Sequence, residues 1–174
     1  WSLPRVEISS GSGHKDFYVT VDPHLGIEKA LRRRDFTVNA MAISLKDGGI
    51  VDPFRGDIDL HDRILRYVDE ETFVEDPLRV LRGAQFCARF GLWPSNETIG
   101  LCQTLVQDYY ALPKERVWEE LKKLLLKGDR PSLGIRFLAA TGWLEHWPEL
   151  AQTFRTPQDP RHHPEGDVDR KSVV

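Results

Sequence analysis

The stretch that decides the fold is residues 75–82, which read Glu75-Asp76-Pro77-Leu78-Arg79-Val80-Leu81-Arg82. Pro77 suits the first turn of a helix, where its missing N–H leaves no bond unmade, and Asp76 before it is a good N-cap residue. Apolar residues then continue at helical spacing as far as Gly91, a typical helix stop. The sequence therefore predicts a helix over 76–90 that begins at a carboxylate.

One face of this helix carries a stripe of charged side chains. Residues three or four apart share a helix face, which aligns Asp76, Arg79, Arg82, Phe86 and Arg89. A carboxylate only accepts hydrogen bonds and a guanidinium only donates them. The stripe is therefore either a recognition surface or, on the simpler interpretation, an ordinary capped helix with solvated arginines.

On the first interpretation, Asp76 and Arg79 complement the edge of two nucleobases. Cytosine and adenine each present an amino donor beside a ring acceptor, so the carboxylate can accept from the amino group while the guanidinium donates to the ring nitrogen. Guanine and uracil present the reverse pattern, and a mismatched buried polar pair costs more than a good pair gains. The pair therefore predicts a preference for C and A.

Composition limits the class of protein. The chain has 174 residues, 40% hydrophobic and 29% charged, which is typical of one globular domain or parts of two. It contains no apolar run long enough to span a bilayer and no signal peptide, so we expect a cytoplasmic protein with no membrane partner. The net charge of -3 argues against a uniformly basic nucleic-acid-binding protein but allows a local basic groove at 32–34. Cys87 and Cys102 lie among apolar residues at helical spacing, which predicts buried, reduced thiols.

The pattern of the chain changes near residue 72. Before it, we expect strands at 5–8 and 17–21, a helix at 25–35, a hairpin around 47–49 and a short strand at 64–68. After it, we expect helices at 76–90, 96–107, 113–127 and 131–142, the third of which carries Val117, Leu121, Leu124 and Leu125 on one face. The predicted fold class is α+β, with a mixed sheet followed by an all-helical part.

Four motifs follow one another in a characteristic order: RRDFTVNAMA at 33–42, DPFRGDIDL at 52–60, ILRYV at 64–68 and EDPLRVLRGAQFCARFGL at 75–92. In this order and spacing they resemble the class II tRNA nucleotidyltransferases, the bacterial CCA-adding enzymes, and their close relatives the bacterial poly(A) polymerases. The resemblance runs from about Leu3 to about Val168.

The resemblance implies three parts. Residues 1–72 match the end of the nucleotidyltransferase head with its mixed sheet, and residues 73–145 match an all-helical neck that binds nucleotide and RNA. Residues 146–174 match the truncated start of the region that follows. Within this last part, HHPEGDV at 162–168 resembles the beginning of the HD-type region of some bacterial members and favours the CCA-adding branch, whereas the last six residues diverge.

The resemblance also implies nucleotide-binding roles for seven residues, which are Arg33, Arg34, Asp35, Asn39, Asp76, Arg79 and Arg82. The first three match a motif that contacts the ribose and helps to choose ribonucleotides, and the fourth is expected near the same pocket. The next two match the pair that reads the incoming base. The last matches an arginine placed for the triphosphate, where a fork of donors suits phosphate oxygens.

Nucleotidyl transfer needs divalent ions, Mg²⁺ by resemblance, held by clustered carboxylates. In the family, an Asp-x-Asp pair after a Gly-rich turn holds them ahead of the motifs seen here. This chain has no such turn, and its Asp57-Ile58-Asp59 is a poor substitute by position. We therefore expect no catalytic or metal-binding residue in this chain, a fragment that lacks the N-terminal catalytic part and is inactive alone.

The function that the resemblance implies is template-independent addition of CCA to tRNA 3′ ends from CTP and ATP, with tRNA as the partner. One alternative is a poly(A) polymerase or A-adding enzyme, which shares every motif quoted above. Another is a non-catalytic fragment that binds RNA or nucleotide.

Overall fold

The computed structural model of the chain describes residues 5–9, 17–21 and 24–153. The first strands, β1 (Arg5–Ser9) and β2 (Phe17–Val21), pair antiparallel, with Arg5 opposite Val21 and Ser9 opposite Phe17. Both predicted strands are therefore confirmed. The HHPEGDV stretch and the last six residues lie outside the described residues.

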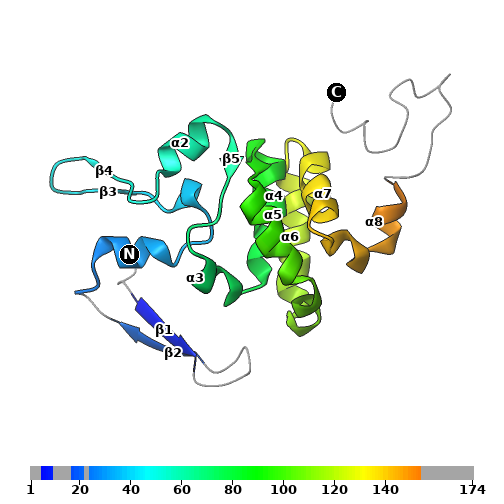
Figure 1. Ribbon diagram of the computed structural model, residues 1–174, viewed down its shortest axis with the longest axis horizontal. Coiled ribbons are helices and arrows are strands. Elements are labelled where there is room, and N and C mark those ends of the chain that lie inside the picture. The colour runs from blue at the N-terminus through cyan, green and yellow to red at the C-terminus, as the bar shows by residue number, and fades with distance from the viewer. Residues whose placement is uncertain (1–4, 10–16, 22–23, 154–174) are drawn as a thin grey trace.

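The segment up to residue 74 consists of short elements, drawn in blue to green in Figure 1: α1 (Ile27–Arg32), η1 (Thr37–Asn39), β3 (Ala42–Ile43), β4 (Ile50–Val51), α2 (Gly56–His61), β5 (Ile64–Leu65) and α3 (Glu70–Val74). The hairpin around 47–49 is confirmed, since β3 and β4 pair antiparallel. The helix expected over 25–35 is shorter, because the backbone at Phe36 is extended and forms a bridge with Tyr67.

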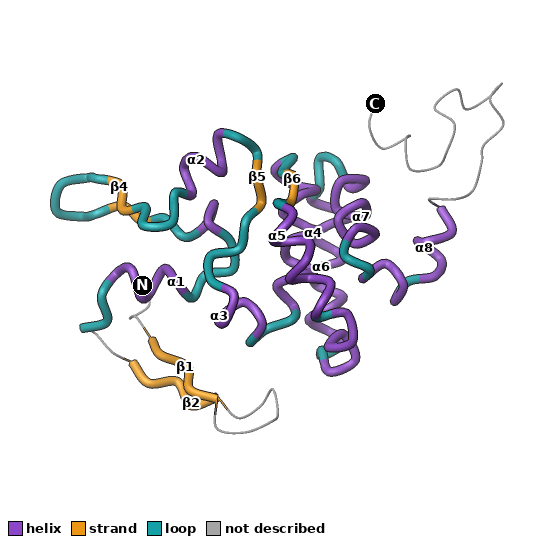
Figure 2. Tube along the Cα trace, viewed as in Figure 1, coloured by secondary structure: helices purple, strands orange, loops and turns teal. Residues whose placement is uncertain are grey.

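The rest of the described chain is mainly helical: α4 (Leu78–Phe90), β6 (Trp93–Pro94), α5 (Asn96–Thr104), η2 (Val106–Ala111), α6 (Lys114–Lys127), α7 (Pro131–Ala140), η3 (Trp143–His146) and α8 (Pro148–Thr153). The helix α4 packs against both α6 and α7, and Figure 2 shows these helices gathered on one side of the molecule. The four helices expected after residue 73 are thus present, each within a few residues of its expected bounds.

Local cap chemistry fixes both ends of α4. At its start, the backbone N–H of Leu78 donates to Asp76 Oδ1 at 3.2 Å. At its end, Gly91 adopts a left-handed conformation with φ 64°, and its N–H donates to the carbonyl of Cys87 at 3.0 Å. The predicted stop is confirmed, whereas the helix proper begins two residues after the predicted start.

The hydrophobic core lies between α4, α6 and α7 and contains the fully buried Leu81, Phe137 and Leu138. Cys87 and Cys102 are buried within it, as predicted. On α6, Val117, Leu121 and Leu124 are buried, whereas Leu125, predicted on the same face, is 43% exposed. It lies beyond the edge of the face that α6 presents to α4.

Two contacts tie the earlier segment to the helices. The strand β5 pairs in parallel with β6, so that Ile64 lies opposite Trp93. Phe36 is fully buried and packs against the rings of Phe73 and Phe86, at centroid distances of 5.7 and 5.6 Å. The segment 32–37 is thereby held against the face of α4.

Among the described helices, none is both long and apolar enough to cross a membrane. The longest, α6, has 14 residues and carries charged side chains along one face.

Candidate functional site

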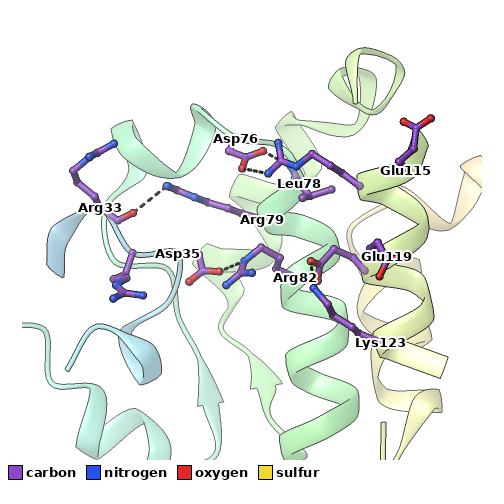
Figure 3. A pocket seen from close by; sticks show the side chains of 12 residues that line it. Arg33, Asp35, Asp76, Leu78, Arg79, Arg82, Glu115, Glu119 and Lys123 are labelled. Carbon is purple, nitrogen blue, oxygen red and sulfur yellow. Dashed lines mark hydrogen bonds and ion pairs between the residues drawn. The ribbon is translucent and has the colours of Figure 1, made fainter. Parts of the chain in front are cut away.

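A pocket of about 520 Å³ opens where the start of α4, the basic segment 33–35 and the charged face of α6 meet. Figure 3 shows Arg79 and Arg82 reaching from α4 toward Arg33 and Asp35 on one side, with Glu115, Glu119 and Lys123 on the other. The lining residues are Arg33, Arg34, Asp35, Asp76, Leu78, Arg79, Arg82, Glu115, Arg116, Glu119, Glu120 and Lys123. Six of the seven residues that the resemblance singles out therefore lie around one pocket.

Asp35 anchors the first wall of the pocket. It is only 5% exposed, and its Oδ2 accepts a hydrogen bond from Arg82 Nε at 2.5 Å. Its Oδ1 accepts hydrogen bonds from Asn39 Nδ2 at 2.7 Å and from the N–H of Phe36 at 3.1 Å. Both oxygens of Asp35 are therefore engaged by protein groups, and a hydrogen bond to a ligand would be an additional one.

Asn39 is the one predicted site residue that does not line the pocket. Its amide donates to Asp35, and its side-chain oxygen accepts from the N–H of Phe36 at 3.3 Å. It lies behind Asp35 in the turn η1 and fixes the direction of that carboxylate. Asn39 therefore acts on the pocket only through Asp35.

Asp76 is shared between the helix start and α6. Its Oδ1 accepts from the N–H of Leu78, while its Oδ2 accepts from Arg116 Nη2 at 3.0 Å. The side chain is about one-third exposed, and each oxygen, with one bond made, has acceptor capacity left. The Arg116 bond holds the carboxylate at the rim of the pocket.

Arg79 joins the helix to the basic segment. Its Nη1 donates to the carbonyl of Thr72, and its Nη2 donates to the carbonyl of Arg33 at 3.0 Å. Burial lowers the pKa of the Arg79 guanidinium, although Asp35 and Asp76 act in the opposite direction. A guanidinium has five N–H donors, so Arg79 retains donors for a ligand.

Arg34 is the most available cation of the pocket. Its side chain is exposed, and within the described part of the chain it makes no side-chain hydrogen bond or ion pair. Arg82, by contrast, is half-buried and held by Asp35. A burial effect lowers the pKa of Arg82, but the charges of Asp35 and Glu120 outweigh it and raise the pKa above its ordinary value. Both guanidiniums offer N–H donors that suit the oxygens of a phosphate chain.

Two family models match this chain, one in its N-terminal part and one in its helical part. Residues 5–66 match the model of the poly A polymerase head domain, and residues 95–154 match the model described as the probable RNA and SrmB-binding site of polymerase A. The Multifunctional CCA protein of Aromatoleum aromaticum is 44% identical over 172 residues, which cover 97% of this chain and 42% of that protein. The protein of the same name from Methylobacillus flagellatus is 43% identical, over 97% of this chain and 41% of its own length.

The chain belongs to the poly(A) polymerase and CCA-adding nucleotidyltransferase family.

Solved structures of the family agree with the fold. One apo CCA-adding enzyme superposes with a TM-score of 0.69 and 30% identity over 97% of this chain and 42% of its own. The Bacillus stearothermophilus CCA-adding enzyme in complex with CTP superposes with a TM-score of 0.68 and 28% identity, over 87% of this chain and 40% of its own. The chain thus spans about 42% of the length of the curated relatives that it matches.

The sequence pattern did not predict that α6 contributes residues to the pocket. Glu115, Arg116, Glu119, Glu120 and Lys123 recur at helical spacing outside the apolar face, which is a signal for a charged face but not for its partner. Only the docking of α6 beside α4 brings them to Asp76 and Arg82.

The far end of the predicted stripe on α4 does not reach the pocket. Phe86 packs against Phe36 and Phe90, and Arg89 Nη1 donates to Gln85 Oε1 at 3.2 Å. Of the predicted stripe, only residues in the first two turns of the helix therefore line the pocket.

The motif DPFRGDIDL stabilises the fold. Gly56 approaches the carbonyl oxygen of Thr37 so closely that a Cβ there would lie 2.1 Å from it. Asp59 is buried and accepts hydrogen bonds from Thr37 Oγ1 at 2.7 Å and from Arg66 Nε at 3.3 Å. Within the described ranges, no three His, Cys, Asp or Glu side chains gather as metal ligands.

Proposed function

We propose that this chain forms the nucleotide-binding head and neck of a CCA-adding tRNA nucleotidyltransferase that uses CTP and ATP. The observation that carries the proposal is the pocket that Asp76, Arg79 and the segment 33–35 line together. The identity to proteins named Multifunctional CCA protein supports it, as do solved CCA-adding enzymes in complex with CTP and with ATP.

The base end of the nucleotide binds at the start of α4. Asp76 offers acceptors to the amino group of cytosine or adenine, and Arg79 offers its remaining donors to the adjacent ring nitrogen. Arg116 on Asp76 and the Thr72 carbonyl on Arg79 hold both groups in place before the nucleotide arrives. Preorganised groups of this kind discriminate strongly, because a wrong base leaves them unpaired.

The phosphate end lies toward the basic segment. Arg34 is exposed and Arg82 has four N–H donors besides the one bonded to Asp35. Two guanidiniums beside one another suit the oxygens of a triphosphate better than a single cation does. In this arrangement Asp35 and Asn39 direct Arg82 rather than the ligand.

The remaining assignments follow from the same function. The helical segment that matches the RNA-binding model, 95–154, contacts the tRNA, and the boundary between head and neck lies near residue 72. Divalent metal serves nucleotidyl transfer in this family, and we propose Mg²⁺ as the ion, with the reaction in the cytoplasm. Mg²⁺ would supply charge stabilisation to the phosphates, and the pocket residues would bind and orient the nucleotide.

Isothermal titration of the chain with each of the four ribonucleoside triphosphates tests the proposal. We expect CTP and ATP to bind on the order of a hundredfold more tightly than GTP and UTP, because two mispaired groups oppose each wrong base. Equal affinity for all four nucleotides, or no binding of any, would contradict the proposal. Arg89→Ala provides a control, since Arg89 lies on the same helix outside the pocket.

A poly(A) polymerase is the second candidate, because the head matches the poly A polymerase model. A hybrid in which this chain replaces its counterpart in the Aromatoleum aromaticum protein separates the two. A CCA-adding enzyme extends a tRNA that lacks its 3′ end with both CTP and ATP, whereas a poly(A) polymerase incorporates ATP alone. Incorporation of ATP without CTP by the hybrid would favour the second candidate.

A further inference from the structure

Two backbone carbonyls direct the guanidinium of Arg79, and neither of them belongs to α4. Its Nη1 donates to the carbonyl of Thr72, within α3. Its Nη2 donates at 3.0 Å to the carbonyl of Arg33, which is the C-cap residue of α1 (Figure 3). The direction of the Arg79 side chain therefore depends on how α3 lies against the end of α1.

A cluster of three residues, Arg32, Asp69 and Thr72, joins α3 to the end of α1. Arg32 is the last residue of α1, and its Nη1 lies 3.2 Å from Asp69 Oδ2. The other oxygen of Asp69 caps α3 by accepting a hydrogen bond from the N–H of Thr72 at 3.0 Å. Thr72 Oγ1 in turn donates to the carbonyl of Arg32 at 3.3 Å. The contacts form a closed ring that includes the residue whose carbonyl accepts from Arg79.

The side chain of Arg32 is also held from outside this cluster. Its Nη2 lies 3.6 Å from Glu28 Oε1, and its Cζ lies 5.6 Å from the ring centroid of Phe54. The side chains of Arg32 and Asp69 are 49% and 20% exposed, and an ion pair this open to water adds little to the stability of a fold. We therefore look for its effect in the placement of α3 against α1.

We propose that Arg32 and Asp69 are positioning residues for the reading of the base, and that they act through Thr72 and Arg79. None of Arg32, Asp69 and Thr72 lines the pocket, so the cluster reaches a bound nucleotide only through Arg79. A guanidinium that is already directed loses less side-chain freedom when it donates to a base. The inference rests on the proposed function, because it takes Arg79 as the group that reads the base.

Titration calorimetry of the full chain with CTP, ATP, GTP and UTP tests the inference in Asp69→Asn. Asparagine is as good a helix cap as aspartate, so this substitution removes the charge that faces Arg32 and keeps the acceptor for the N–H of Thr72. We expect CTP and ATP to bind roughly three- to fivefold more weakly, the size typical of a partly exposed ion pair, and GTP and UTP to change little. Arg32→Gln should produce the same change from the other side of the pair.

Combining Asp69→Asn with Arg79→Ala shows whether the effect passes through Arg79. Without the guanidinium the cluster has nothing to direct, so Asp69→Asn should leave all four affinities of the Arg79→Ala chain unchanged. If Asp69 instead has an independent structural role, it lowers the affinities by the same factor in both backgrounds, which would contradict the inference.

Glu97→Gln is the matched control, because it removes the carboxylate of another exposed ion pair, with Arg66, outside the pocket. It should leave the four affinities unchanged, and circular dichroism melting of each variant checks folding. Unchanged ratios between the four nucleotides in both Asp69→Asn and Arg32→Gln, or an equal loss for all four, would overturn the inference and leave the proposed function standing. Absence of nucleotide binding by the unsubstituted chain would overturn both.

Discussion

Arg82 Nε lies 2.5 Å from Asp35 Oδ2, in an ion pair between residues 47 positions apart in the sequence. The carboxylate side chain is 4% exposed and the guanidinium 33% exposed, so the pair is screened only partly by water. Asn39 completes the arrangement from behind by donating to the other oxygen of Asp35. The orientation of Arg82 toward the pocket therefore depends on a residue of the basic segment.

Asp35→Asn tests this dependence. The amide can no longer pair with the Arg82 charge, and removing one partner of a partly buried pair leaves the other directed poorly. We expect CTP and ATP to lose affinity together, by roughly tenfold each, as measured by calorimetry. Asp57→Asn, an exposed residue of α2, should have no effect. A loss confined to ribonucleotides would instead support the direct ribose contact that the resemblance implies.

Arg79→Ala tests the base-reading role of the helix start. Loss of the guanidinium removes the donor to the ring nitrogen of cytosine and adenine, and also the group that opposes guanine and uracil. In the hybrid enzyme, incorporation of CTP and ATP should fall by about tenfold or more, while rejection of GTP and UTP relaxes.

Arg89→Ala is the comparison for Arg79→Ala, since both residues lie on α4 but Arg89 bonds to Gln85 outside the pocket. If the four incorporation rates keep their ratios in Arg79→Ala, the helix start does not read the base. The start of α4 would then have only a structural role, as a well-capped helix terminus.

The start and end of α4 could be predicted because their chemistry is local. Asp76 and Pro77 precede the helix within two residues, and Gly91 takes the left-handed conformation that glycine adopts most readily. The motif order predicts Arg33, Asp35 and Arg79 at one site, although Arg79 lies far from the other two in the chain. In a single sequence, residues far apart in the chain can be assigned to one site only through resemblance to a family.

The rest of the site depends on tertiary packing. Glu120 and Arg116 face the pocket because α6 docks beside α4, and the charged face of a helix does not specify its neighbour. Phe86 shares the predicted stripe with Arg79. The ring of Phe86 nevertheless packs against Phe36, which is buried in the core, and does not line the pocket. Helical spacing predicts which side chains share a face, but not how many turns of that face a pocket covers.

The two thiols should be inert in the folded chain. Burial raises the pKa of Cys102 to about 12 and raises the pKa of Cys87 as well. At pH 8 both groups are therefore neutral thiols, and the thiolate is the reactive form. We expect negligible reaction with a disulfide reagent such as DTNB in buffer, and reaction of both cysteines in concentrated urea. Rapid labelling of either residue in buffer would contradict the buried placement.

Two glycines in helices should respond to alanine with opposite signs. A Cβ on Gly134 of α7 would lie 2.5 Å from the carbonyl oxygen of Ala84 and 2.9 Å from Leu124 Cδ1, so α7 would have to move away from α4. Such overpacking typically costs about 1–3 kcal/mol. Gly100 of α5 is exposed and has nothing within 4 Å of a Cβ. Gly100→Ala should therefore stabilise the fold by about 0.5–1 kcal/mol, because alanine loses less conformational entropy in a helix.

Urea unfolding followed by circular dichroism measures both free energies of unfolding, with the unsubstituted chain as the reference. A lower midpoint for Gly134→Ala and a higher one for Gly100→Ala is the expected result, at an unchanged dependence on urea concentration. Because the two substitutions add the same methyl group to a helix, their difference isolates the contact between α7 and α4. Equal effects of the two substitutions would show that α7 does not approach Ala84 as closely as the structure has it.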